Sequence, residues 1–310
     1  MAKAKDTDWN NADNGGESTD ESAAAEVALK GTGKVSKALK ENLIRDKVME
    51  LKRDRDDDIM PDFDLDSALM DTSSSKKVFT VYGHKNDAKT TTAMGVAKKG
   101  DKVAVLSFDL KSDRPTDLDF IKKSGVDYKV FNAILYLDKS TPDLYQTTAE
   151  KTYVFVLKLL DGIKEKYKPD WVIIDGSEFL NKILEQVMRK RNGVMPYQGV
   201  ANQNIWKERT QYIDDVHKQA MDAATKGIMY TTYVSKDSVV KDGVVVQQKD
   251  MPKWLGDVMS QTDVIIRVIT DVSGGKTEYK AVIESSKFPR EFPPGEYVIT
   301  NKRLYDVINK

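Results

Sequence analysis

The sequence predicts an α/β fold, in which a mostly parallel sheet is flanked by helices and extended by antiparallel strands toward the C-terminus. Strand patterns at 77–82 and 102–108 enclose a helical stretch at 90–99, which makes a strand–helix–strand unit. The run 171–175 is apolar up to its last residue, as expected of a parallel strand covered on both faces. Beyond residue 238 the pattern changes to that of hairpins.

The other elements follow from composition and periodicity in chain order. Helices are predicted where apolar residues recur at helical spacing, at 148–167, 180–191, 204–224 and near 301–308. Strands are predicted at short β-branched or aromatic runs, at 126–131, 134–137, 227–233, 239–246 with an Asp-Gly turn, 264–270 and 278–284.

Residues 1–75 are predicted to form an arm ahead of a folded body at 76–310. Residues 1–35 read as a disordered acidic tail, 36–60 as an amphipathic helix and 61–75 as a linker. The chain as a whole is neutral, but the arm carries 11 Lys and Arg against 18 Asp and Glu, a net charge of −7 that leaves +7 on the body. Such an arm either competes with nucleic acid for the basic body or serves as a solubilising tail.

Composition excludes several classes of function. Hydrophobic residues make up 40% of the chain and charged residues 32%, and no run is long and apolar enough for a membrane span. The first residues turn acidic without an apolar stretch, so no secretory signal is expected. Cysteine is absent and only two histidines occur, which excludes disulfide scaffolds and leaves little material for zinc sites or Ser-His-Asp triads.

A phosphate-binding loop is predicted between the first body strand and the helix after it. In that context backbone N–H groups face the phosphates, Lys89 reaches the β- and γ-oxygens, and the Thr90 hydroxyl ligates Mg²⁺. Ala88 stands where the usual pattern has its second glycine, and a left-handed alanine costs roughly 1–2 kcal/mol. An ordinary polar loop that contains Lys-Thr-Thr remains the alternative. The candidate nucleotide-binding residues of the loop are Gly83, Asn86, Asp87, Ala88, Lys89, Thr90 and Thr91.

A second motif supports this interpretation. The apolar strand at 171–175 ends in Asp175, which a parallel sheet brings to the same edge as the loop. There Asp175 and Thr90 are candidate Mg²⁺ ligands. A carboxylate at a strand end is common in α/β proteins, so the order and spacing of the two motifs carry the inference.

With these motifs the chain resembles the RecA-like P-loop ATPases, and among them the phage and archaeal-virus nucleotide-binding proteins of single-strand annealing and recombination. The resemblance covers roughly residues 76–300. It rests on the phosphate loop, the strands ending in Asp109 and Asp175, the hydroxyl residues at 230–232 and the stretch 283–290. It implies ATP and Mg²⁺, a homo-oligomeric ring or filament, single-stranded DNA as a partner, and a cytoplasmic location, in the host if the protein is viral.

The resemblance also implies roles for individual residues. The family's water-activating Glu falls on Lys111, which leaves Asp109 or Asp113 as substitutes and predicts slow hydrolysis. Thr232, with Thr231, takes the polar sensor position, or is a plain strand end. Lys287 and Arg290 reach the nucleotide of a neighbouring subunit, or are solvated charges beside a proline turn.

Basic residues cluster at 188–193 and at 207–209, the latter with Trp206 adjacent, and this mix of cations and an aromatic ring suits single-stranded DNA. Alternatively, they complement a helix C-terminus and pack Trp206 into the core. The function predicted from the sequence is therefore that of a slow ATPase that handles DNA. A degenerate P-loop protein that acts as a non-catalytic assembly module is the alternative.

Overall fold

The computed structural model describes residues 76–241, 244–253, 258–273 and 275–309. The predictions for the arm lie outside the described residues. The described strands are β1 (Lys77–Gly83), β2 (Lys102–Ser107), β3 (Asp127–Asn132), β4 (Trp171–Asp175), β5 (Gly227–Lys241), β6 (Val244–Pro252), β7 (Val264–Ser273), β8 (Lys276–Ser286) and β9 (Gly295–Val298). The described α-helices are α3 (Lys89–Met94), α4 (Asp119–Lys122), α5 (Pro142–Lys166), α6 (Ser177–Arg191), α7 (Trp206–Ala223), α8 (Val258–Gln261) and α9 (Leu304–Ile308).

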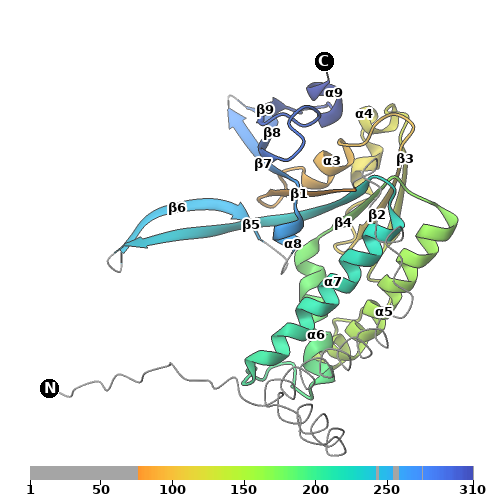
Figure 1. The fold of residues 1–310 in the computed structure, drawn as a ribbon, viewed down its shortest axis with the longest axis vertical. Coiled ribbons are helices and arrows are strands. Elements are labelled where there is room, and N and C mark those ends of the chain that lie inside the picture. The colour runs from red at the N-terminus through yellow and green to blue at the C-terminus, as the bar shows by residue number, and fades with distance from the viewer. Residues whose placement is uncertain (1–75, 242–243, 254–257, 274, 310) are drawn as a thin grey trace, which may run out of the picture. The chain divides into compact units, whose positions relative to one another are not determined.

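The sheet has the strand order β3-β2-β4-β5-β1-β7-β8-β9, with β6 paired to β5 (Figure 1). The strands from β3 to β7 run parallel, and β8 and β9 continue the sheet in the antiparallel sense. The predicted fold class, a mostly parallel α/β sheet with antiparallel strands toward the C-terminus, is confirmed. Because the parallel strands end at one edge, the loops that follow β1, β2 and β4 gather there, beside the middle of β5.

Each face of the sheet has its own hydrophobic core. One core packs α5, α6 and α7 against one face, and the other packs α3, α4 and α9 against the opposite face (Figure 1). Strand β4 contributes to both cores: Ile173 belongs to one and Ile174 to the other, and all five residues of the strand are buried. Alternate side chains of a strand point to opposite faces, so a run without polar alternation is what this position requires. No described helix is long and apolar enough to cross a bilayer.

The prediction of a strand at 134–137 is wrong. These residues form a turn, in which the Leu137 amide donates to the Ile134 carbonyl at 3.0 Å and the Ile134 amide to Asn132 Oδ1 at 3.0 Å. The Asn side chain satisfies the backbone that a strand partner would otherwise hold. Helix α3 is also shorter than the predicted stretch 90–99, since it ends at Met94. The next residue, Gly95, packs closely against α9: a Cβ there would lie 3.0 Å from the Leu304 amide nitrogen.

Strand β5 pairs with different strands along its length. Its first residues pair in parallel with β1 and β4, and from Val234 onward it pairs with the antiparallel β6 instead. The resulting β5–β6 hairpin extends away from the parallel strands (Figure 1). The predicted Asp-Gly turn, residues 242–243, lies outside the described residues.

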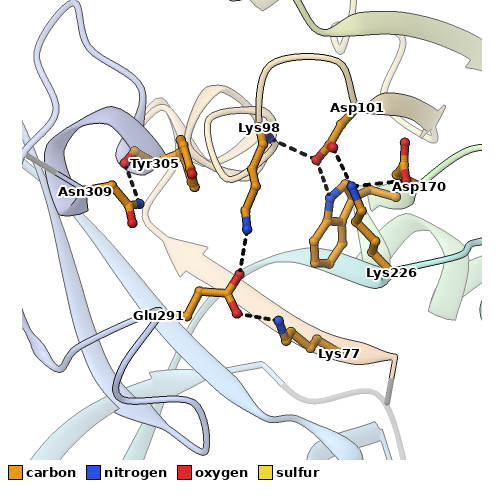
Figure 2. A network of polar contacts seen from close by, with 9 residues as sticks. Lys77, Lys98, Asp101, Asp170, Lys226, Glu291, Tyr305 and Asn309 are labelled. Atoms are coloured by element: carbon orange, nitrogen blue, oxygen red, sulfur yellow. Dashed lines mark hydrogen bonds and ion pairs between the residues drawn. The ribbon is translucent and has the colours of Figure 1, made fainter. Parts of the chain in front are cut away.

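The amino ends of the central strands are tied together by ion pairs (Figure 2). Glu291 bridges Lys77 at 2.5 Å and Lys98 at 3.3 Å. Asp101 accepts from Trp171 Nε1 at 3.0 Å and from Lys226 Nζ at 2.6 Å. These contacts link residues at the starts of β1, β4 and β5.

Candidate functional site

The predicted phosphate loop lies between β1 and α3, at the edge where the parallel strands end. Its first residue, Gly83, is fixed by packing: a Cβ there would lie 2.7 Å from the Val268 carbonyl oxygen on β7. The loop is held by Asp87, whose carboxylate accepts from the His84 amide at 2.5 Å and from Thr270 Oγ1 at 2.7 Å. Asp87 is buried, so within this structure it shapes the loop and anchors it to β7.

Ala88 adopts the left-handed conformation that the missing glycine would favour. Its φ and ψ are 56° and 29°, and it immediately precedes the first residue of α3. Asn86 also has a positive φ, of 73°, but asparagine tolerates this region better than alanine does. The loop therefore carries a local energetic cost at Ala88.

We expect Ala88→Gly to raise the free energy of unfolding by about 0.5–1 kcal/mol, because relief of roughly 1–2 kcal/mol of strain outweighs the added entropy of a glycine in the unfolded chain. Urea unfolding measures the change. Ala93→Gly is the matched control, since Ala93 lies within α3, and glycine in a helix costs about 1 kcal/mol. Equal losses of stability in both variants would contradict the strain at Ala88.

Lys89 is directed toward the loop it follows. Its Nζ donates to the His84 carbonyl at 2.6 Å and lies 4.4 Å from the ring centre of Tyr233. Burial lowers the pKa of Lys89, and the negative charges of Glu178, Asp87, Asp175 and Asp109 oppose that change. The Lys89 ammonium is half-buried beside the loop, a position in which a cation can contact the oxygens of a phosphate bound there.

Asp175 and Thr90 meet as predicted for a metal site, although 85 positions separate them in the sequence. Thr90 Oγ1 lies 2.9 Å from both carboxylate oxygens of Asp175. Ser112 and Thr231 also donate to this carboxylate, each at 2.5 Å. Asp175 is 3% exposed; burial raises its pKa, and the three hydroxyls oppose the rise. A carboxylate beside a hydroxyl is an oxygen donor set that fits Mg²⁺, which binds through few protein ligands and keeps several waters.

Glu178 is a site residue that the sequence reasoning missed. It lies in the first turn of α6, three residues after Asp175, and is 7% exposed. Its Oε1 accepts from Thr232 Oγ1 at 2.9 Å and from the Tyr233 amide. The signal was present in the sequence, because a carboxylate in the first turn of a helix that follows a strand end is directed to that edge.

Lys89, Asp175 and Glu178 line one cavity of about 320 Å³. Gly83, Thr90 and Thr91 of the predicted loop do not line it. Four cationic and four acidic side chains line it among the described residues, the cations being Lys85, Lys89, Lys111 and Arg114 and the acids Asp87, Asp109, Asp175 and Glu178. The lining is thus charge-balanced, and it brings together Asn86, Ala88 and Thr231 from the predicted set. Lys111 lies on the cavity wall, in the position where the resemblance led us to look for a Glu.

Other predicted residues lie outside the cavity lining. Asp113 is exposed on the turn after β2, and Thr232 is buried behind Glu178. Lys287 pairs with Asp263 at 3.0 Å. It follows the end of β8, which pairs with the start of β7, next to the start of β1 and away from Gly83. Lys287 and Arg290 therefore lie near the amino ends of the parallel strands, whereas the predicted phosphate loop of the same chain lies at their carboxyl ends.

The basic cluster at 189–191 is compensated by ion pairs within the fold, and the arginine of the second cluster is stacked on an aromatic ring. Lys190 and Arg191 contact Glu150 at 2.9 and 3.1 Å, and Arg189 pairs with Glu185 at 2.9 Å. In the second cluster, the Arg209 guanidinium stacks on Trp206, 4.7 Å from its ring centre.

No protein-family model and no curated protein sequence matches the chain. Among solved structures, the chain is similar to the KaiC-like protein PH0186 from the archaeon Pyrococcus horikoshii, with 8% identity and a TM-score of 0.34 over 73% of this chain and 87% of that one. It is also similar to the flagellar accessory protein FlaH from Methanocaldococcus jannaschii, with 12% identity and a TM-score of 0.37 over 74% of this chain and 88% of that one. At such low identity these likenesses transfer no residue role, so the function is inferred from the geometry of the site itself.

Proposed function

We propose that this chain is a RecA-like P-loop protein that binds ATP with Mg²⁺ in the cavity at the carboxyl edge of its sheet and hydrolyses it slowly. The observation that carries the proposal is the meeting of Thr90 and Asp175 across 85 positions, next to the ammonium of Lys89. A loop that contained Lys-Thr-Thr by chance would have no reason to face a buried carboxylate from another strand.

Each group has a distinct part in this proposal. Lys89 binds the phosphate oxygens, and the loop amides before it orient them. Thr90 and Asp175 would hold Mg²⁺, which would supply positive charge that neutralises the phosphates. Glu178, fixed by Thr232 and the Tyr233 amide, orients the attacking water and accepts its proton.

Calorimetric titration with ATP tests the proposal, first with Mg²⁺ and then with excess EDTA, beside a phosphate-release assay. Heat of binding that requires Mg²⁺ is the expected result, together with a turnover below about 1 per second, the low end of ordinary enzyme rates. The absence of binding at millimolar ATP in both conditions would contradict the proposal.

Slow hydrolysis is proposed because Lys111 holds the wall position at which a second carboxylate would help to activate water. Lys111→Glu is therefore expected to raise the rate of phosphate release severalfold, since general-base assistance contributes about 100-fold or more when fully developed. Lys111→Gln removes the ammonium without adding a base and is the control. Equal rates in the two variants would show that the carboxylate adds nothing.

The finer parts of the proposal are DNA recombination or annealing as the process and a homo-oligomeric ring or filament as the working form. The position of Lys287 and Arg290, at the sheet edge opposite to their own loop, is compatible with a role at a neighbouring copy's nucleotide.

A non-catalytic assembly module is the second candidate function. The strained Ala88 and the Lys111 position favour it, because both would weaken nucleotide turnover while leaving the fold intact. Sedimentation of the protein with and without ATP–Mg²⁺ distinguishes the two candidates, since a pure assembly module forms the same oligomer in both conditions.

A further inference from the structure

Two cavities along the outer side of α5 form one continuous groove. The first, of about 440 Å³, lies between the edge strand β3 and the C-terminal half of α5. The second, of about 700 Å³, follows the middle of α5 toward the end of α6. Phe155 and Lys158 line both cavities. We call the two together the α5 groove; it shares no lining residue with the ATP cavity.

The α5 groove is positively charged. Lys129, Lys151, Lys158 and Lys166 line it, and all four are exposed. None of the four forms an ion pair with a residue in the part of the chain that the structure describes. Among the described residues the one acidic side chain in the lining is Glu150, and Lys190 and Arg191 already contact it. The four ammonium groups are thus available to an anionic ligand.

Aromatic rings stand beside these cations. Tyr136 is 49% exposed and packs edge-on against Phe155, with ring centres 5.0 Å apart at 83°. At the other end of the groove, the ring centres of Phe131 and Tyr167 are 6.4 Å apart, and the Lys129 ammonium lies 4.4 Å from the Tyr167 ring centre. A half-exposed ring in the same cavity lining as Lys151 and Lys158 offers a stacking surface and a phosphate contact together.

This chemistry selects one class of ligand. A simple anion would need the lysines but not the exposed ring of Tyr136. An apolar peptide would need the rings but would leave four ammonium groups without a partner. A flexible chain that alternates phosphates with planar bases uses both, and its bases are accessible only when it is single-stranded. We propose that the α5 groove is a binding surface for single-stranded nucleic acid.

The proposal rests on the DNA-handling part of the proposed function and names its surface. It also relocates that surface, because the arginines at 188–193 and Arg209 are paired or stacked within the fold, whereas none of the four groove lysines forms an ion pair with a described residue. Since the groove and the ATP cavity share no lining residue, both ligands can be bound at once.

Fluorescence anisotropy of the full chain with a fluorescein-labelled oligothymidine, at low salt, tests the proposal. Lys158→Glu is expected to weaken binding about tenfold or more, because it turns a phosphate contact into a repulsion at the centre of the groove. Lys164→Glu is the matched control, since Lys164 is exposed on the same helix and lines neither cavity. It should change the affinity by about threefold at most, through screened long-range charge alone.

A second variant tests the stacking. Phe155→Leu keeps an apolar side chain in the groove and is expected to weaken oligothymidine binding about fivefold or more, while the dependence of affinity on salt stays as in the parent. Heparin, a polyanion without bases, is the comparison ligand, and its affinity should not respond to Phe155→Leu.

Three outcomes would overturn the proposal: no binding of oligothymidine by the parent, equal affinity for Lys158→Glu and Lys164→Glu, or equal loss of heparin and oligothymidine binding in Phe155→Leu. Thermal unfolding and ATP calorimetry on each variant complete the design. A variant that unfolds or loses ATP binding reports damage to the fold, and loss of oligothymidine binding with ATP binding intact concerns the groove alone.

Discussion

Replacing Lys89 by alanine is expected to weaken ATP–Mg²⁺ binding by about 3 kcal/mol, or more than 100-fold. The reason is the electrostatic surroundings of its ammonium: four carboxylates act on it, those of Glu178, Asp87, Asp175 and Asp109. Once the ammonium is removed, the acidic groups remain and repel the triphosphate. The variant should therefore lose the charge-assisted contacts and also acquire an unfavourable field.

Calorimetric titration measures the loss, and Lys99→Ala is the control. Lys99 is exposed shortly after α3 and does not line the cavity, so its removal should leave the affinity within about twofold through screened charge alone. Lys89→Arg adds a test of geometry, because it keeps the charge but replaces a compact ammonium by a planar fork. If Lys89→Ala binds ATP as tightly as the parent, the phosphate-loop assignment fails.

Glu178→Gln should lower the rate of phosphate release by about 100-fold, the usual contribution of a positioned general base, with little change in ATP affinity. Glutamine keeps an acceptor oxygen for the Thr232 hydroxyl and the Tyr233 amide, both of which bond to Glu178 Oε1. The fold of the first turn of α6 is therefore retained, and only the proton-accepting carboxylate is removed.

Two further carboxylates show which group activates water. Asp113→Asn should leave the rate unchanged, since Asp113 is exposed and does not line the cavity. Asp109→Asn is the competing case, because Asp109, the other substitute predicted from the sequence, lines the cavity. A large rate loss in Asp109→Asn with none in Glu178→Gln would move the water-activating role from α6 to the loop after β2.

The central part of the fold could be predicted from the sequence because its signals are local. The run at β4 lacks polar alternation, and the structure buries all five of its residues between two cores. The same reasoning gave a wrong prediction at 134–137, where the structure has a turn. Its apolar residues resemble a strand, but Asn132 satisfies the Ile134 amide from within the turn, and a hydrogen bond of this kind leaves no trace in hydrophobic periodicity.

In the candidate site, too, some residues could be predicted from the sequence and others only from the structure. Lys89, Thr90 and Asp175 were found because each stands at a strand or helix end, where the sequence pattern itself changes. The partners that complete the site come from distant segments: Thr270 holds Asp87 across 183 positions, and Ser112 reaches Asp175 across 63. Which strands are neighbours decides those contacts, and strand order is not encoded in local spacing.

By itself, the sequence determined the class of sheet and singled out Lys89, Thr90 and Asp175 as candidates at strand and helix ends, because periodicity and strand-end chemistry act over a few residues. Only the tertiary structure decided that Ala88 is left-handed, that Glu178 lies in the cavity while Asp113 does not, and that the lysines of α5 stand free beside aromatic rings. The physical reason is that backbone strain, burial and charge compensation depend on what the rest of the chain brings to each residue. Those neighbours are fixed by the packing of whole strands and helices.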